Sequence, residues 1–228
     1  MKRFRVLIGL LIVIVFAGFV VAGLEKGDES LTKLMDGNKR FVSGNLAQKD
    51  LGDAKRKELA KGQKPFAIVL TCSDSRVAPE LLFDQGLGDV FVVRVAGNVV
   101  DPVVIRSIEY AAEHLGTPFL LILGHSHCGA VKATLEVNES KGKPCVLAQK
   151  IMPAVLTAKK KGGSHDEILE TAIKENVKNV YKDVMKSKII NHLVHEGKLK
   201  IVAGEYSLET GEVETIELPK AVSTKKAH

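Results

Sequence analysis

Three side chains that can bind a metal ion stand in two short polar segments of the sequence. Cys72 lies in residues 71–76, whereas His125 and Cys128 lie three apart in residues 124–129. Residues three apart share one face of a helix, so His125 and Cys128 are expected to point the same way at the start of a helix. Zinc accepts thiolate and imidazole donors, and three protein ligands leave a fourth position for water, as in catalytic sites. The set predicts a catalytic zinc site.

The residues alone also allow other interpretations. Taken singly, Cys72 and Cys128 are typical of buried free thiols, which are common in protein cores. His127 is a competing imidazole, but it adjoins Cys128 and so points off the face that Cys128 uses. Cys145 lies far from both segments and is interpreted as structural. A chain with three cysteines does not indicate a disulfide framework, which needs an even set.

Short apolar runs predict the strands that must position these segments. Residues 66–70, 90–95 and 119–123 are typical of strands buried on both faces, and each run ends in a polar loop. Helical patterns alternate with them, which predicts an α/β fold with a mostly parallel central sheet flanked by helices. Ligands bind beyond the carboxyl ends of such strands, so the loops that carry Cys72 and His125 should lie close together.

The remaining elements complete this prediction. Helices are expected at residues 29–42, 53–61, 105–115, 132–137, 152–161 and 168–196, and two closing strands at residues 199–203 and 213–218. The first two helices are expected to form an N-terminal helical arm rather than part of the core. Residues 24–228 are predicted to be a single domain, with a disordered tail at 219–228.

The N-terminus has the composition of an export signal. Residues 1–5 are basic, and residues 6–24 carry no charge. This pattern predicts either a cleaved signal peptide at 1–23 or an uncleaved membrane anchor through 6–24. A buried core helix is not indicated, because the segment has no polar face. Both interpretations predict an exported protein with a periplasmic or other extracytoplasmic domain.

The charge pattern does not indicate a nucleic-acid partner. The formal net charge is +6, but the lysines are scattered, the chain has no tryptophan, and no aromatic residues alternate with a basic stripe. A solvated, lysine-rich surface explains the charge, and 45% hydrophobic residues predict a packed core.

The two polar segments together resemble the signatures of β-carbonic anhydrases. The first reads Cys-Ser-Asp-Ser-Arg at residues 72–76, and the second reads Gly-His-Ser-His-Cys-Gly at residues 124–129. Residues 94–98 and 107–111 also match, and the resemblance extends over residues 31–218. It implies the fold of that family and one Zn²⁺ per chain, bound by the same two cysteines and histidine. The implied activity is that of a lyase, the reversible hydration of CO2 to bicarbonate and a proton through a zinc-bound hydroxide.

The resemblance also implies roles for residues around the metal. Asp74 can either bind the zinc, which closes the site, or bond Arg76, which leaves a position for water and lets the carboxylate accept a proton from the hydroxide. Gln63, Phe91 and Tyr110 match the substrate pocket of the plant-like branch, with an amide donor and an apolar wall. Core packing is the alternative for the two aromatic residues.

One position bears on regulation. The family's other branch has a regulatory bicarbonate site that uses a tryptophan three residues before the first cysteine ligand, where this chain has Val69. The resemblance therefore implies the plant-like, type I pattern, an open site at neutral pH and no inhibition of this kind. It also implies a homodimer or a larger homo-oligomer in which the N-terminal helix, residues 31–41, contacts the partner subunit.

Two other functions fit the same residues. CS2 and COS are linear like CO2, so a hydrolase of either on the same scaffold is an alternative. The other is a non-catalytic zinc-binding protein in which Asp74 stays on the metal. A thiol redox protein is not indicated, because the sequence has no Cys-x-x-Cys. His127, His114 or buffer are the candidates for carrying away the proton.

Overall fold

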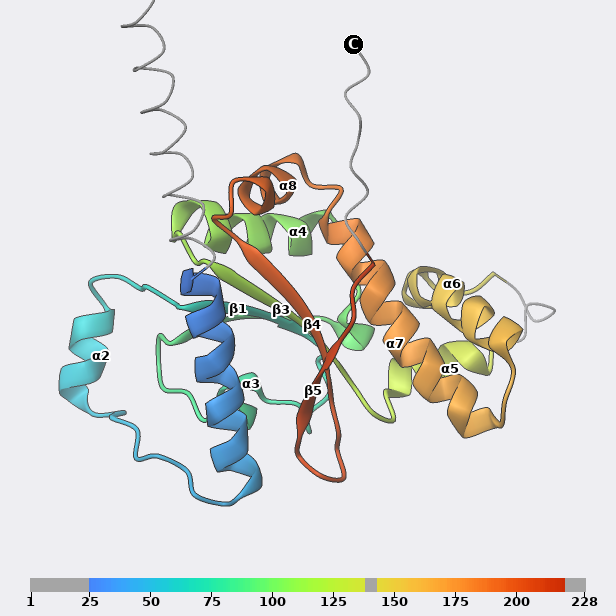
Figure 1. The fold of residues 1–228 in the computed structure, drawn as a ribbon, viewed down its shortest axis with the longest axis horizontal. Helices are drawn as coiled ribbons and strands as arrows, with labels where there is room; N and C mark the ends of the chain where they lie inside the picture. The colour runs from blue at the N-terminus through green and yellow to red at the C-terminus, as the bar shows by residue number, and fades with distance from the viewer. Residues whose placement is uncertain (1–24, 138–142, 220–228) are drawn as a thin grey trace, which may run out of the picture.

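A computed structural model describes residues 25–137 and 143–219, and in this part of the chain five strands form one sheet (Figure 1). The strands are β1 (Ala67–Thr71), β2 (Val90–Arg94), β3 (Phe119–His125), β4 (Lys200–Tyr206) and β5 (Val213–Ile216). Their order is β2-β1-β3-β4-β5, and only β5 runs antiparallel to its neighbour. The predicted α/β fold with a mostly parallel sheet is confirmed.

The order of the strands creates a switch point at the carboxyl end of β1. β1 lies between β2 and β3, so that Thr71, its last residue, is paired with Arg94 on one side and Leu123 on the other. The chain leaves β1 for one neighbour and later returns to the other, and ligands bind at such switch points. The residues that follow β1 and those that end β3 therefore lie side by side.

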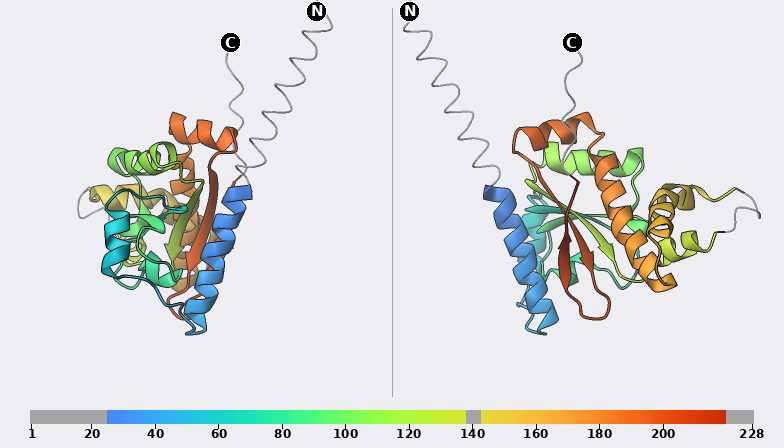
Figure 2. Two further views of the ribbon diagram at one scale, coloured as in Figure 1. Left: turned by 90° about the vertical axis from the view of Figure 1, so that its left-hand side faces the viewer. Right: turned by 45° about the vertical axis from the view of Figure 1, so that its right-hand side comes forward.

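Alternate residues of the central strands face two hydrophobic layers. Ile68 and Leu70 pack on one side of β1, and Ala67 and Val69 pack on the other. The first side is covered by α4 (Pro102–Glu109), the π-helix η2 (Tyr110–His114), α7 (His165–Val184) and α8 (Lys188–His195). The second side is covered by the N-terminal helix (residues 25–42) and α3 (Pro79–Leu82), and the side views separate the two layers (Figure 2).

A third group of apolar residues lies beside the carboxyl end of β1. The helices α5 (Gly129–Leu135), α6 (Val146–Lys161) and α7 pack together there (Figure 1). This cluster also contains Cys72 and Cys128, which are 4% and 2% exposed. The two thiols are therefore buried at the place where the sheet meets the helical lobe.

Several helices begin or end elsewhere than predicted. The predicted helix 168–196 is two helices, because the side chain of Ser187 accepts a hydrogen bond from the Ile190 amide at 3.1 Å and so starts α8 anew. The helix predicted to begin at residue 132 begins at Gly129, and the one predicted to begin at 152 begins at Val146. The short helix α2 (Asp53–Leu59) has no buried residue.

The N-terminal helix is tied to the core of the same chain. Its Asn38 is 4% exposed. The Asn38 amide donates hydrogen bonds to the carbonyl oxygens of Leu82, at 3.1 Å, and Gly211, at 2.8 Å. Its side-chain oxygen accepts a bond from the Val213 amide at 3.0 Å. This helix is thus part of the second layer, whereas α2 stands apart from the sheet (Figure 1).

Two predictions fall largely outside the described residues. The leader or anchor at 1–23 lies wholly outside them, and so does the tail predicted at 219–228, apart from Pro219. In residues 25–137 and 143–219, no helix has the length and apolar character needed to cross a membrane.

We expect Asn38→Leu to lower the free energy of unfolding by about 3 kcal/mol, because it leaves three backbone groups without this partner, and two of these hydrogen bonds are buried. Urea denaturation followed by circular dichroism measures this. The control is Lys39→Ala, which removes only an exposed ion pair to Asp36 and should cost less than about 0.5 kcal/mol. Equal stability of the two variants would contradict the role of Asn38.

Candidate metal centre

The ends of β1 and β3 bring three potential metal ligands together. Cys72 directly follows β1, His125 is the last residue of β3, and Cys128 immediately precedes α5. The two sulfurs and one ring nitrogen of His125 lie within 4.8 Å of one another, and all three residues are buried. One ion can therefore contact all three donor atoms.

The prediction that His125 and Cys128 share one face of a helix is wrong, although the two side chains do converge. The expected shared helix face does not exist, because His125 belongs to β3 and the helix starts only at Gly129. The chain instead turns through His127, which has a left-handed backbone with φ 52°. This turn directs Cys128 back towards His125.

The hydrogen bonding of His125 leaves one ring nitrogen free for a metal. Nδ1 lies 2.9 Å from the carbonyl oxygen of Ser126 and donates to it. Nε2 then carries a lone pair, and it is buried with no hydrogen-bond partner among the described residues. A buried nitrogen without a partner is costly, and metal-binding histidines have this pattern, with the other nitrogen bonded to a carbonyl.

The two thiols have opposite acidities in the absence of a cation. The hydrogen bond from the Cys128 thiol, opposed by burial, lowers the pKa of Cys72 to about 4. The hydrogen bond to Cys72 together with burial raises the pKa of Cys128 far above its usual value. One thiolate thus forms readily, and a divalent cation would favour loss of the second proton, since metals bind thiolates. The donor set fits a thiophilic metal ion such as zinc.

Asp74 lies beside the cluster and is held by Arg76. The Arg76 side chain donates from Nε to Oδ1 at 2.9 Å and from Nη2 to Oδ2 at 2.8 Å. The Arg76 backbone amide also donates to Oδ1, at 3.0 Å. These bonds, led by those of the side chain, hold the pKa of Asp74 well below its usual range. Oδ2 lies 3.9 Å from Nε2 of His125, so the ionised carboxylate stands next to the metal ligands.

Sequence reasoning assigned no role to two residues that support the loop after β1. Arg94 donates from Nε to the Cys72 carbonyl at 3.0 Å and from Nη2 to the Asp74 carbonyl at 2.6 Å. The Gly97 amide donates to the Cys72 sulfur at 3.2 Å. Their position could have indicated this role, because Arg94 is the last residue of β2, the strand next to β1, and Gly97 lies in the loop that follows.

The residues predicted to bind substrate are only partly brought together. The rings of Phe91 and Tyr110 have centroids 6.2 Å apart, and Phe91 also packs against the first hydrophobic layer. Tyr110 is 46% exposed. Gln63 is exposed in the loop before β1 and makes no side-chain hydrogen bond with the described residues.

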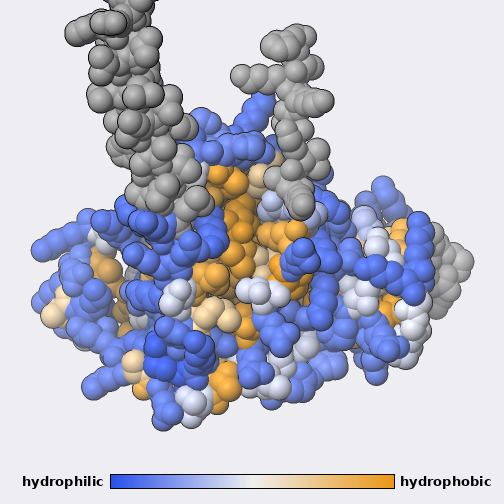
Figure 3. Space-filling view, viewed as in Figure 1, coloured by the Kyte–Doolittle hydropathy of each residue, from blue (hydrophilic) through white to orange (hydrophobic). Residues whose placement is uncertain are grey.

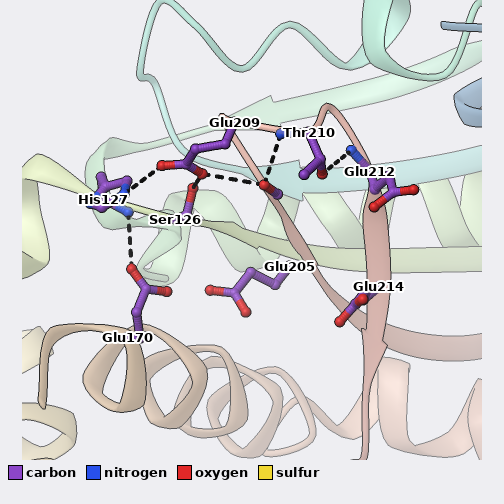
Figure 4. A pocket seen from close by; sticks show the side chains of 9 residues that line it. Ser126, His127, Glu170, Glu205, Glu209, Thr210, Glu212 and Glu214 are labelled. Carbon is purple, nitrogen blue, oxygen red and sulfur yellow. Dashed lines mark hydrogen bonds and ion pairs between the residues drawn. The ribbon is translucent and has the colours of Figure 1, made fainter. Parts of the chain in front are cut away.

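The side chain of His127 lines an acidic pocket, where it lies beside the carboxylates of Glu209 and Glu170 (Figure 4). Its Nε2 lies 2.6 Å from Oε1 of Glu209, and its backbone amide lies 3.4 Å from a carboxylate oxygen of Glu170. The pocket is lined by Ser126, His127, Glu170, Glu205, Ser207, Glu209, Thr210, Glu212 and Glu214. The contacts of His127 with Glu209 and Glu170 hold the turn between His125 and Cys128.

Glu205 is a largely buried carboxylate of this pocket. Its side chain is 13% exposed, and Oε1 has no hydrogen-bond partner among the described residues. Burial raises its pKa to about 7, with a further upward effect of Glu170 and a downward effect of Lys174, whose Nζ lies 3.3 Å from Oε2. The side chain therefore titrates near neutral pH.

The comparisons with known proteins agree with this geometry. The carbonic anhydrase family model matches residues 67–213. The chain is 42% identical over 186 residues to a carbonic anhydrase of Mycolicibacterium smegmatis, with 79% of this chain and 89% of that protein covered. It is 40% identical over 183 residues to carbonic anhydrase 2 of Mycobacterium tuberculosis, with 78% and 87% covered.

A solved structure shares the fold. The structure of the β-carbonic anhydrase CcaA is similar with a TM-score of 0.66 and 28% identity, and the match covers 82% of this chain and 95% of that one. The chain belongs to the carbonic anhydrase family. Within that family of lyases, whose general activity is CO2 hydration, it belongs to the β class, and the resemblance found in the sequence is confirmed.

We expect the purified protein to bind one divalent metal ion per chain and Cys72→Ala to weaken metal binding by more than about 100-fold, because a donor is lost outright. Elemental analysis and chelator competition measure this. The matched control is Cys145→Ala, which removes an exposed thiol and should bind metal normally. Equal metal content in both variants would refute the assignment of the ligands.

We expect Glu205→Gln to stabilise the protein by roughly 1–3 kcal/mol at pH 8 but much less at pH 5. The folded pKa, about 7, lies above the ordinary value of 4.5, so wild-type stability falls as pH rises from 4.5 through 7. The neutral amide removes this loss. Thermal unfolding at both pH values measures it, with exposed Glu214→Gln as control, and a Glu205→Gln effect independent of pH would contradict it.

Proposed function

We propose that this protein catalyses the reversible hydration of CO2 to bicarbonate and a proton, using one Zn²⁺ per chain held by Cys72, His125 and Cys128. The observation that carries the proposal is the convergence of these donors beside a carboxylate that Arg76 holds. When bound, the ion lowers the pKa of a water molecule from about 15.7 towards about 7 and so supplies a nucleophile. The thiolates of Cys72 and Cys128 neutralise much of its charge, so activity should rise between about pH 7 and 9.

Asp74 and Arg76 position the attacking water in this proposal. Arg76 donates two hydrogen bonds to Oδ1 of Asp74 and one to Oδ2, which keeps the carboxylate ionised and bonded to the guanidinium. The remaining lone pair of Oδ2 can accept a hydrogen bond from the water and fix its orientation towards CO2. A paired Asp74 supports a site open to water and disfavours the alternative in which this residue stays on the metal.

The proposed substrate pocket consists of Phe91, Tyr110 and Gln63. The two rings, which contact each other, offer an apolar wall for CO2. The Gln63 amide can donate to an oxygen of CO2 or bicarbonate. This glutamine is exposed in the single chain, which is compatible with a site completed in a homo-oligomer.

A homodimer or larger homo-oligomer is part of the proposal. Hydrophobic surface gathers in the middle of the face seen in Figure 3, between the N-terminal helix and α7 with α8. Ile201 of β4 and Ile216 of β5 are partly buried against the first hydrophobic layer, and apolar surface of this kind favours contact with another subunit. The N-terminal helix, at its margin, is the proposed contact element.

We also propose the type I pattern and an exported location. Val69 fills the position of the regulatory tryptophan and is fully buried in β1, so inhibition by bicarbonate at that site is not expected. The basic start and uncharged run of residues 1–24 support export, either with a cleaved signal peptide or with a retained anchor.

Metal analysis combined with stopped-flow CO2 hydration tests the function. We expect zinc in the purified protein, hydration that increases from pH 7 to 9, and a turnover roughly 10- to 100-fold lower in Arg76→Ala, because Asp74 loses its positioning contact. Zinc content should be unchanged in Arg76→Ala, which separates positioning from metal binding. The control Arg56→Ala alters an exposed arginine on α2 and should leave hydration unchanged.

Three outcomes would contradict parts of this proposal. Zinc without hydration in the wild type would indicate a non-catalytic metal protein. Hydrolysis of CS2 or COS without CO2 hydration would indicate the other enzyme. Normal turnover in Arg76→Ala would refute the role of the Asp74–Arg76 pair.

A further inference from the structure

One buried amide has no explanation in the packing of its own helix. The described buried residues of α7 are Leu169, Ala172, Ile173, Asn176, Val177, Val180 and Val184. Asn176 is the polar member of this set and is 2% exposed. Burying an amide among apolar side chains costs free energy unless its hydrogen bonds are satisfied, so its partner should matter.

The partner of Asn176 belongs to the metal centre. Its Nδ2 donates a hydrogen bond of 2.8 Å to the carbonyl oxygen of Gly97, a residue 79 positions away in the sequence. The amide of the same glycine donates to the Cys72 sulfur at 3.2 Å. Asn176 and Cys72 are therefore linked through the two backbone groups of one residue.

The conformation of Gly97 explains why it needs an external contact. Its φ and ψ are 63° and 18°, in the left-handed region that favours glycine. A Cβ here would lie 2.8 Å from Cδ1 of Ile151 and 3.3 Å from Cβ of Ala130, so no other residue fits without a shift. Because glycine restricts its own rotation least, a contact from another element must fix the direction of its amide.

We propose that Asn176 is a positioning residue of the metal centre: by holding the Gly97 carbonyl, it aims the Gly97 amide at the Cys72 sulfur and thereby sets the donor strength of that thiolate towards the metal. A hydrogen bond to a thiolate draws electron density from the sulfur and fixes its position, as contacts behind metal ligands do. The inference rests on the proposed function, because it requires that Cys72 bind the ion.

The contact bears on the chemistry through the sulfur. A thiolate that gives less electron density to the ion leaves the ion more acidic, which favours ionisation of water. The Gly97 amide thus offsets part of the neutralisation by two thiolates, and Asn176 secures this effect from a helix that touches no reacting atom. Asn176 is distinct from the Arg94 contacts, which reach the carbonyls of the loop rather than the sulfur.

The Co²⁺-substituted full-length protein provides the test. The charge-transfer band from sulfur to Co²⁺ reports the electron density on the thiolates independently of activity. In Asn176→Leu, and in Asn176→Asp, whose carboxylate cannot donate to Gly97, we expect this band to shift to longer wavelength. We also expect Zn²⁺ affinity, measured by chelator competition, to fall about 10-fold, because the Cys72 sulfur loses the contact that fixes its position.

The matched control is Val180→Ala, on the same buried face of α7 and in the first hydrophobic layer. It should lower stability without moving the band or the affinity. An unshifted band in both Asn176 variants would overturn the inference, as would failure of both to fold while Val180→Ala folds, since Asn176 would then serve folding. Lack of metal binding by the wild type would instead refute the proposed function itself.

Discussion

The parallel pairing of β1 with β3 is the constraint on which the metal centre depends. Leu123 lies opposite Thr71, so the residue after β1 and the last residue of β3 emerge at the same edge of the sheet. A slip of one residue in this register would turn every side chain of β1 to the opposite layer. Ile68 and Leu70 pack in one hydrophobic layer and Val69 packs in the other, so a slip would exchange side chains of different shape between two closely packed layers. The same packing that makes the core thus fixes the distance between Cys72 and His125.

The sequence predicted this arrangement where local patterns carried the information. The apolar runs of β1, β2 and β3 are continuous because both faces of each strand are covered, and their polar ends mark the functional edge. The division of the predicted helix 168–196 was missed, since a single side chain, Ser187, ends one hydrophobic pattern and starts the next. The prediction that His125 and Cys128 share a helix face was wrong, because the turn at His127 depends on contacts from the β4–β5 hairpin.

Those contacts could not be predicted, because they join residues that are distant in the chain. Glu209, in the loop between β4 and β5, binds both the Ser126 hydroxyl and the His127 ring. Asn176 reaches Gly97 across 79 residues. Neither pairing leaves a periodic signal, and each becomes visible only when the helices and strands are placed. Short segments of the sequence therefore indicate which residues form the site, but the contacts that position those residues come from distant parts of the chain.

Backbone strain shows where this precision is needed. Among described non-glycine residues, positive φ angles occur at Asp84, Asn98 and His127, and the last two adjoin the metal centre. Such conformations cost about 1–3 kcal/mol each and persist only when surrounding contacts hold them. At His127 the Glu209 carboxylate provides that contact, and beside Asn98 the Asn176 amide does so through Gly97. The loop that supplies Cys128 is thus anchored by a polar side chain from a distant element, and so is the loop after β2, whose Gly97 amide donates to the Cys72 sulfur. Rigidity at the ligands therefore comes from residues that contact these loops rather than from the loops themselves.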